Sequence, residues 1–174
     1  NRHLKHIIAK ANRKLGYFRR NFYMATSSLK KLLYSTCIRQ WLEYASFIWD
    51  PGGTTLTHEL EAVQNRSVRC ILSNYTRTAS VTLMTFQLNL PELASRRKIA
   101  QISLFHKTYY YNNSLREHFV KHPSFISPTI DHPQKVHVPQ SRTTTHLRAF
   151  IPRTTSQWNL LSRSATAITD TSRF

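Results

Sequence analysis

Lysine and arginine are the chemically informative residues of this sequence, because they are numerous and unbalanced by acids near the N-terminus. The 174 residues include 25 Lys or Arg and 8 Asp or Glu, which gives a net charge of +17. The first 42 residues contain ten of these cations and no acid. Such side chains bind phosphates and carboxylates through charge-assisted hydrogen bonds. The sequence therefore predicts a polyanionic partner, with nucleic acid as the leading one.

The cations near the N-terminus alternate with apolar residues at helical spacing, over about residues 2–22. The apolar positions are Leu4, Ile7, Ile8, Ala11, Leu15, Phe18 and Phe22, which fall on one face of a helix. Bases and aromatics mixed on the remaining surface suit phosphate contact combined with stacking. Arg96, Arg97 and Lys98 form another basic cluster, expected on a helix surface. The residues that we expect to bind nucleic acid are Lys10, Arg13, Lys14, Arg20, Lys30, Lys31, Arg96 and Lys98.

Acidic residues are too few and too dispersed to predict a catalytic metal site. They are Glu43, Asp50, Glu59, Glu61, Glu92, Glu117, Asp131 and Asp170, and none is adjacent to another. Polymerase and nuclease sites hold divalent metal with two or more converging carboxylates. Glu59 and Glu61 fit the first turn of a helix that begins near Thr57, where the helix dipole favours acids. We expect no catalytic residue, no metal site and no cofactor in this chain, and no small-molecule substrate.

Histidine and cysteine give no further site. His132, His137 and His146 lie in a proline-rich region with spacing that fits no zinc pattern, so we expect solvated loop histidines. Cys37 and Cys70 form no C-x-x-C motif, and we expect both to pack in the core as small apolar residues.

Caps and helix breakers predict the remaining elements. Residues 26–28 supply an N-cap for a second helix that runs to about Trp49, stopped by residues 50–53, with the aromatics at 41, 44, 47 and 49 in the core. Ser80 caps a short helix through Leu88. A longer helix follows from Pro91 to about Tyr111 and ends at 112–114, before one or two more turns.

These elements predict a mainly α fold. Only three glycines occur, which disfavours a sheet protein with many tight turns. We expect a bundle of about five helices over residues 1–120, and an extended Pro/Thr/His-rich arm over 121–174 with a short terminal helix opened by Pro152. No apolar stretch approaches the roughly 20 residues that span a bilayer, so no membrane partner is expected. The chain starts inside a helical pattern, and we expect it to be a fragment of a longer protein.

Six stretches of the sequence resemble one family, in the same order along the chain. They are IAKANRKLGYFRRN, LKKLLYSTCIRQWLEYASFIWDP, LEAVQNRSVRCIL, NYTRTASVTLMTFQLNLPELASRRKIAQISLFHK, SRTTTHLRAFIPRT and QWNLL. Together they are similar to the segment that follows the palm in reverse transcriptases of non-LTR (LINE-type, jockey-like) retrotransposons. The string LEYASFIWDP and the elements Pro152–Thr154 and Trp158–Asn159 are the most specific parts. Residues 121–150 are poorly matched, and the tail after Leu161 is short.

The resemblance implies a helical thumb that grips an RNA/DNA or RNA duplex as it leaves the active site. The family activity is RNA-directed DNA synthesis, and its catalytic aspartates and divalent metal would belong to a palm upstream of Asn1. This chain alone would then be inactive, and would have the rest of the polymerase polypeptide as a partner. An intracellular location, in cytoplasm and nucleus, is expected.

Three alternatives remain open from the sequence. The chain could be a helical module that docks onto acidic protein or onto the rest of a polymerase without touching nucleic acid. It could be a decayed genomic copy of a retroelement with no selected role. A free-standing enzyme is the third alternative, and the lack of paired carboxylates disfavours it.

Overall fold

The computed structural model describes residues 2–50, 53–171 and 173–174, and these residues form helices and loops without any β-strand. The predicted mainly α fold is confirmed. Two residues of the predicted helix stop, Pro51 and Gly52, lie outside the described residues.

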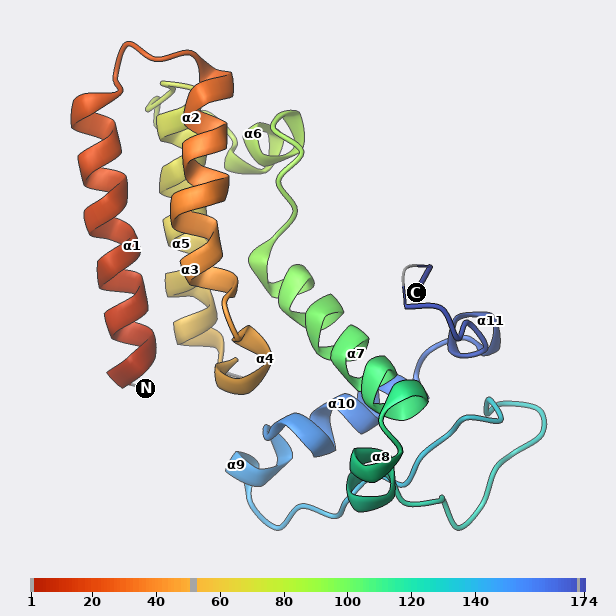
Figure 1. The fold of residues 1–174 in the computed structure, drawn as a ribbon. Helices are drawn as coiled ribbons and strands as arrows, with labels where there is room; N and C mark the ends of the chain where they lie inside the picture. The colour runs from red at the N-terminus through yellow and green to blue at the C-terminus, as the bar shows by residue number, and fades with distance from the viewer. Residues whose placement is uncertain (1, 51–52, 172) are drawn as a thin grey trace. The chain divides into compact units, whose positions relative to one another are not determined.

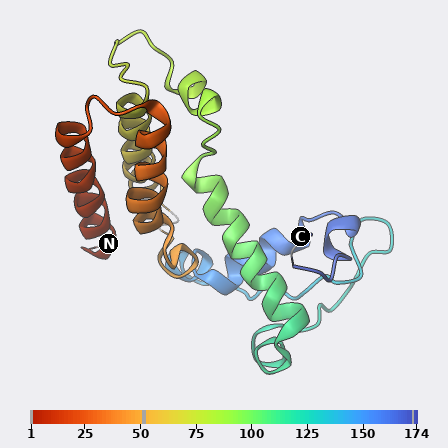
Figure 2. The same cartoon turned by 45° about the horizontal axis from the view of Figure 1, so that its top comes forward.

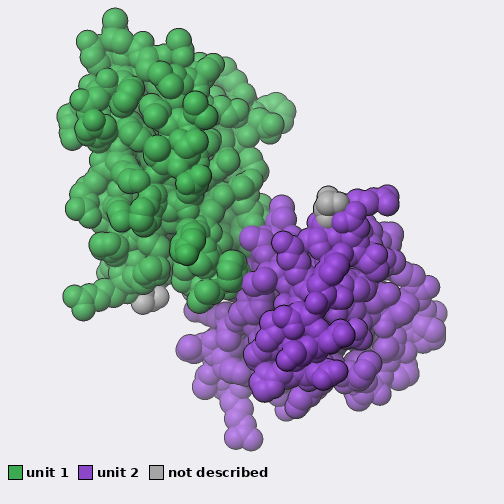
Figure 3. Space-filling view, viewed as in Figure 1, with its two compact units in different colours: residues 1–97 green, residues 98–174 purple. Residues whose placement is uncertain are grey.

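The chain divides into two compact units, residues 1–97 and residues 98–174 (Figure 3). The sequence placed a division at residue 120, in front of the proline-rich segment. In the structure the division falls inside the long helix α7 (Leu93–Tyr111), because the two ends of this helix pack in different hydrophobic cores.

Unit 1 is built on α1 (Arg2–Asn21) and α5 (Thr54–Ile71), with the chain between them folded as a third, interrupted helix (Figures 1 and 2). The interrupted helix comprises α2 (Ser27–Leu33), the π-helical stretch η1 (Tyr34–Arg39), α3 (Gln40–Glu43) and α4 (Ser46–Trp49), and α6 (Val81–Gln87) follows α5. The apolar stripe predicted for the first helix faces the core. Its buried members are Leu4, Ile7, Ile8 and Ala11, and Leu15 and Phe18 pack against them while partly exposed. Each fully buried aliphatic side chain contributes about 1.5–3 kcal/mol, so this stripe holds α1 against the unit.

The second helix does not run unbroken to Trp49, as the sequence predicted. Thr26 caps it as expected and accepts a hydrogen bond from the Leu29 amide at 3.4 Å, but the helix breaks after Glu43. Ala45 adopts a left-handed conformation with φ of 50°, and the indole N–H of Trp49 donates to the Tyr44 carbonyl at 2.7 Å. The break turns Tyr44 outward, so its side chain is 80% exposed rather than in the core.

Helix α5 begins at Thr54, three residues before the predicted start, so Glu59 and Glu61 lie beyond its first turn. The first-turn explanation of these acids is therefore wrong. Glu61 instead accepts hydrogen bonds from the amides of Leu93 and Ala94, at 3.3 and 2.7 Å. A helix N-terminus has unpaired N–H groups and a partial positive charge, so this carboxylate caps α7 from a different helix.

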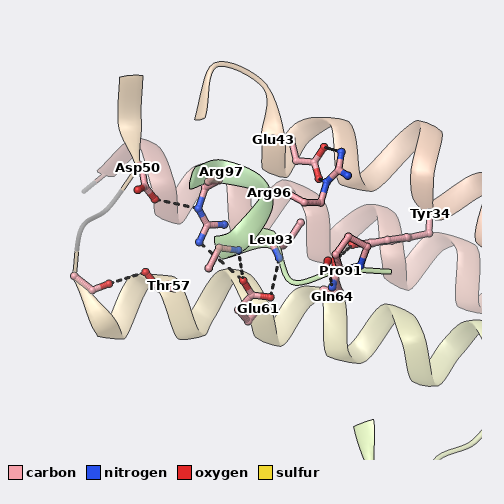
Figure 4. A network of polar contacts seen from close by, with 12 residues as sticks. Tyr34, Glu43, Asp50, Thr57, Glu61, Gln64, Pro91, Leu93, Arg96 and Arg97 are labelled. Atoms are coloured by element: carbon pink, nitrogen blue, oxygen red, sulfur yellow. Dashed lines mark hydrogen bonds and ion pairs between the residues drawn. The ribbon is translucent and has the colours of Figure 1, made fainter. Parts of the chain in front are cut away.

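Arg97 is buried, although the sequence placed it on a helix surface. Its side chain is 2% exposed, and its Nε donates to Asp50 Oδ1 at 3.0 Å while Nη2 lies 4.0 Å from Glu61 Oε1 (Figure 4). The consecutive charges Arg96–Lys98 cannot all face solvent, because a helix turns by 100° per residue and α7 packs on one side. Arg97 thereby links α7 to α5 and to the end of α4.

Two neighbouring contacts extend this polar network (Figure 4). Arg96 forms a two-point pair with Glu43, and its Nη2 donates to Oε2 at 3.0 Å. The Tyr34 hydroxyl donates to Gln64 Oε1 at 2.7 Å, and the same amide donates to the Pro91 carbonyl at 3.1 Å. Burial raises the pKa of Tyr34, so its hydroxyl remains a hydrogen-bond donor.

Unit 2 contains the rest of α7 with α8 (Asn113–Phe119), α9 (Thr144–Leu147), α10 (Phe150–Asn159) and α11 (Arg163–Thr166). Its core is centred on Trp158, which is fully buried against Phe105 with ring centroids 5.3 Å apart. The indole N–H donates to the Gln134 carbonyl at 2.9 Å, and Asn159 exchanges two hydrogen bonds with the backbone of Val136, at 3.0 and 2.7 Å.

The segment expected to be a weakly ordered arm is thus attached to this core. The sequence predicted extended chain from 121 to about 150; residues 121–143 contain no helix, but α9 (Thr144–Leu147) interrupts the rest of that range. Val136 and His132 are buried. His132 is 3% exposed and bonds through Nε2 to the Trp158 carbonyl at 3.2 Å, so the expectation of a solvated loop histidine is wrong. The short helix predicted near Pro152 is present as α10, which begins at Phe150, two residues earlier, but it is not terminal, because the unpredicted helix α11 follows it.

The ion pairs of Arg97 can be tested by substitution. Arg97→Met removes the buried cation that contacts Asp50 and Glu61, and we expect it to lower the free energy of unfolding by about 3 kcal/mol. The matched variant Arg96→Met removes a pair in which the arginine is 37% exposed, and should cost less than about 1 kcal/mol. Urea unfolding followed by circular dichroism measures both, and equal losses would contradict the assigned role of Arg97.

His132 makes the stability of unit 2 dependent on pH. Burial lowers the pKa of His132 below its ordinary 6.5; the Trp158 carbonyl and Asp131 oppose this shift, while Lys135 and Arg163 add to it. As the pH falls, the unfolded chain binds this proton first, so the stabilisation is complete above pH 6.5 and is lost below it. Thermal unfolding at pH 7, 6 and 5 should show a falling midpoint. His132→Gln should flatten this dependence, and an unchanged slope would refute the assignment to His132.

Candidate nucleic-acid interface

The side of α1 opposite the core carries exposed cations and one aromatic residue. Arg13, Tyr17 and Arg20 are all exposed, and the Tyr17 side chain has 54% of its surface in solvent. Arg13 and Arg20 are seven residues apart, so they lie on the same face about 10 Å from one another along the axis. This face of α1 is accessible to a partner.

Lys10 and Lys14 lie where α1 borders the interrupted helix, and both approach the ring of Trp41. The ammonium of Lys10 is 3.6 Å from the ring centroid and that of Lys14 is 5.0 Å from it. Lys14 also donates to the Cys37 carbonyl in η1 at 3.2 Å. An open hollow of about 550 Å³ lies here, lined by Lys10, Arg13, Lys14, Tyr17, Phe18 and Cys37. The structure therefore brings three of the predicted binding residues together beside an aromatic ring.

Trp41 was expected in the core and is 38% exposed. The sequence gives no direct signal of this, because an aromatic residue in a helix is consistent with either environment. Both cysteines are partly rather than fully buried, and each remains a free thiol. We name Lys10, Arg13, Lys14 and Tyr17 of α1 together with Trp41 of α3 the α1–α3 surface.

The other predicted binding residues differ in their surroundings. Lys30 donates to the Tyr23 carbonyl at 3.0 Å and to Ser73 Oγ at 2.8 Å, so it joins two loops. Lys31 is half-buried on α2, and Lys98 is exposed on α7. Arg96 is held by Glu43, and this hydrogen bond raises its pKa. The guanidinium of Arg96, which was expected to bind phosphate, is therefore hydrogen-bonded to the carboxylate of Glu43.

The paired acids of unit 1 contact cations of η1 and of the start of α7 rather than those of α1. Within the described part of the chain, the ion pairs of this unit join Glu43 to Arg39 and Arg96, and Asp50 and Glu61 to Arg97. No cation of α1 or α2 takes part in them. The α1–α3 surface therefore carries positive charge that is uncompensated by neighbouring acids, which is the electrostatic condition for binding a polyanion.

The described residues form neither a metal-binding cluster nor a membrane-spanning helix. No three His, Cys, Asp or Glu side chains among them converge as a metal site would require. None of their helices has both the length and the apolar character needed to cross a bilayer.

Comparisons with protein-family models, curated proteins and solved structures gave no match for this chain.

The contact between Lys10 and Trp41 can be measured as a coupling energy. We expect Lys10→Met, Trp41→Leu and the double variant to give a coupling of about 0.5–1 kcal/mol in urea unfolding, as for cation–π pairs at exposed sites. Lys5→Met is the matched control, because Lys5 is exposed on the same helix and has no such ring contact among those described. Strict additivity of the Lys10 and Trp41 substitutions would show that the ring does not position this ammonium.

Proposed function

We propose that this chain binds the sugar-phosphate backbone of a nucleic-acid duplex, as part of an RNA-directed DNA polymerase of the non-LTR retrotransposon type. The observation that carries the proposal is the cationic outer side of α1, which has no acidic partner among the described residues. The resemblance of six stretches to the region after the palm in these polymerases supplies the biological context.

Each cation would act as a phosphate clamp and not as a base reader. Arg13 and Arg20 are too far apart to share one phosphate, since two helical turns separate them by about 10 Å. They would contact different phosphates of one strand, while Lys10 and Lys14 approach from the side of Trp41. Phosphate contacts fix position and carry no sequence information, so binding would be tolerant of base sequence.

The chemistry of DNA synthesis would belong to residues outside this chain. In the family that the sequence resembles, adjacent aspartates in the palm hold the divalent metal. The chain described here would hold the template–primer duplex and contact the remainder of the polypeptide. Gripping the duplex keeps the primer end at the active site between additions, which is a positional contribution to catalysis.

Exposed apolar side chains favour a second candidate, a module that docks onto protein. Helix α6 exposes Leu83 and Phe86 by 71% and 86%, and Ile48 of α4 is 75% exposed. Such residues would suit attachment to the rest of a polymerase. This candidate predicts no salt-dependent affinity for nucleic acid.

Charge reversal on α1 tests the proposal. Arg13→Glu with Arg20→Glu should weaken binding of an RNA/DNA hybrid at least about tenfold, because two phosphate contacts are replaced by repulsion. The matched control is Arg142→Glu with Arg148→Glu, which changes the net charge equally at exposed positions of unit 2. Fluorescence anisotropy at 50 and 200 mM salt measures the affinity.

Salt dependence gives the second measurement of this experiment. Six to eight phosphate contacts predict a slope of about −5 to −7 for log affinity against log salt, and the α1 variant should reduce its magnitude by about 2. Equal losses in the two double variants would show that net charge alone drives binding. Absence of binding by the unmodified chain would overturn the proposal and favour the protein-docking module.

A further inference from the structure

A second hollow lies on the other flank of α1, between this helix and α5. It has a volume of about 280 Å³ and is lined by Asn12, Leu15, Gly16, Arg19, Arg66, Arg69, Cys70 and Tyr75. Three of the eight lining residues are arginines and none is an acid. Its volume is close to the lower end of the roughly 300–1,000 Å³ typical of small-molecule sites, so it suits one small group rather than a duplex. We name it the three-arginine pocket.

Arg69 is fixed in this pocket by the backbone of the loop after α5. Its Nη1 donates to the Thr76 carbonyl at 2.9 Å and its Nη2 to the Ala79 carbonyl at 3.3 Å. A guanidinium has five N–H groups, and these two bonds engage two of them. The same contacts hold the loop that carries Tyr75, so the arginine and the aromatic ring are positioned together.

Tyr75 and Arg19 form the aromatic side of the pocket. The Arg19 guanidinium carbon lies 5.1 Å from the centre of the Tyr75 ring, and the tyrosine side chain is 52% exposed. Burial and a hydrogen bond with the Cys70 thiol raise the pKa of Tyr75, so the hydroxyl stays protonated at neutral pH. Leu15 adds an apolar wall beside these groups. The pocket thus offers both a stacking surface and cations.

Gly16 leaves space in the pocket that helix packing does not require. A Cβ built at this position meets one atom within 4 Å, the end of the flexible Arg20 side chain at 3.7 Å. Glycine inside a helix costs about 1 kcal/mol relative to alanine. Since no close neighbour demands a glycine here, the packing leaves room for a larger side chain at this position in the pocket wall.

We propose that the three-arginine pocket binds a single nucleotide, with its base against Tyr75 and Arg19 and its phosphate held by Arg66 and Arg69. Three guanidinium groups without an acid select an anion, and their planar forks match phosphate oxygens. The apolar and aromatic walls select a flat ring attached to that anion, which inorganic phosphate lacks. The nucleotide is either free or the unpaired terminal nucleotide of a bound strand, and the strand-bound form rests on the function proposed above.

Two titrations distinguish these sources. Adenosine 5′-monophosphate, adenosine and inorganic phosphate are each titrated into the full chain by calorimetry and ligand-observed NMR. Separately, a blunt RNA/DNA hybrid is compared by anisotropy with the same hybrid carrying one or two unpaired nucleotides. A pocket for free nucleotide binds the monophosphate more tightly than either of its halves, and a pocket for a strand end binds the overhang hybrid more tightly than the blunt one.

Variants of the pocket test whether the binding of the monophosphate or of the overhang hybrid depends on these residues. Arg66→Gln should weaken the nucleotide-dependent signal about tenfold, as expected for loss of one hydrogen bond to a charged group. Tyr75→Leu should weaken it at least about fivefold through lost stacking. Gly16→Leu fills the pocket without removing a charge and should abolish the signal. Arg77→Gln is the matched control, because Arg77 is an exposed cation of the same loop that does not line the pocket.

The outcomes separate this proposal from the function above. Two results together support both duplex binding by α1 and nucleotide binding by the pocket. The affinity for the blunt duplex falls in the Arg13/Arg20 variant but not in Gly16→Leu, and Gly16→Leu loses the nucleotide signal. A nucleotide signal without duplex binding supports the pocket alone. The proposal is overturned if neither titration gives a signal, if inorganic phosphate binds as well as the monophosphate, or if Gly16→Leu, with circular dichroism unchanged, retains full binding.

Discussion

The burial of Arg97 beside Asp50 and Glu61 is the interaction on which the arrangement of unit 1 depends. A charge inside a protein is costly unless it is paired. Arg97, at the start of α7, is stabilised in its buried position by the carboxylates of Asp50 and Glu61. Glu61 meets a second requirement with the same side chain, because it also accepts from two amides that a helix N-terminus leaves unpaired. The start of α7 is thereby fixed against α5 and the end of α4 by polar contacts as well as by apolar packing.

This use of acids determines where the positive charge of the unit remains. Glu43, Asp50 and Glu61 pair with arginines at residues 39, 96 and 97, while the cations of α1 have no acid in their own helix. Crowded like charges oppose folding through mutual repulsion, and a bound polyanion relieves that repulsion. Both hollows beside α1 combine cations with aromatic side chains: Tyr17 and Phe18 line the first, and Tyr75 lines the three-arginine pocket. Stacking and charge together are the combination that single-stranded and terminal nucleotides require.

Unit 2 is organised differently, around one large aromatic residue and the polar groups that surround it. Trp158 is completely buried, and the backbone and side chains of a proline-rich segment close over it through Gln134, Val136 and His132. Prolines remove amide donors and prevent a regular helix, so this segment relies on side chains such as Asn159 to satisfy its backbone. A chain with little secondary structure is thus held in place by specific hydrogen bonds to a core residue.

The sequence by itself determined the mainly helical fold, the cap at Ser80 and the apolar face of α1, because helical periodicity and caps act within a few residues. It also identified the cations of α1 as the candidate surface. It did not predict the break after Glu43 or the short helices α9 and α11. Only the tertiary structure decided which polar residues are buried. The sequence pattern predicted Arg97 and His132 at the surface and Trp41 in the core. Their environments depend on partners more than twenty positions away, such as Lys10 beside Trp41 and Asp50 beside Arg97. Local sequence pattern specifies the conformation of a segment, whereas burial and charge pairing depend on which segments meet, and that is fixed only when the chain packs.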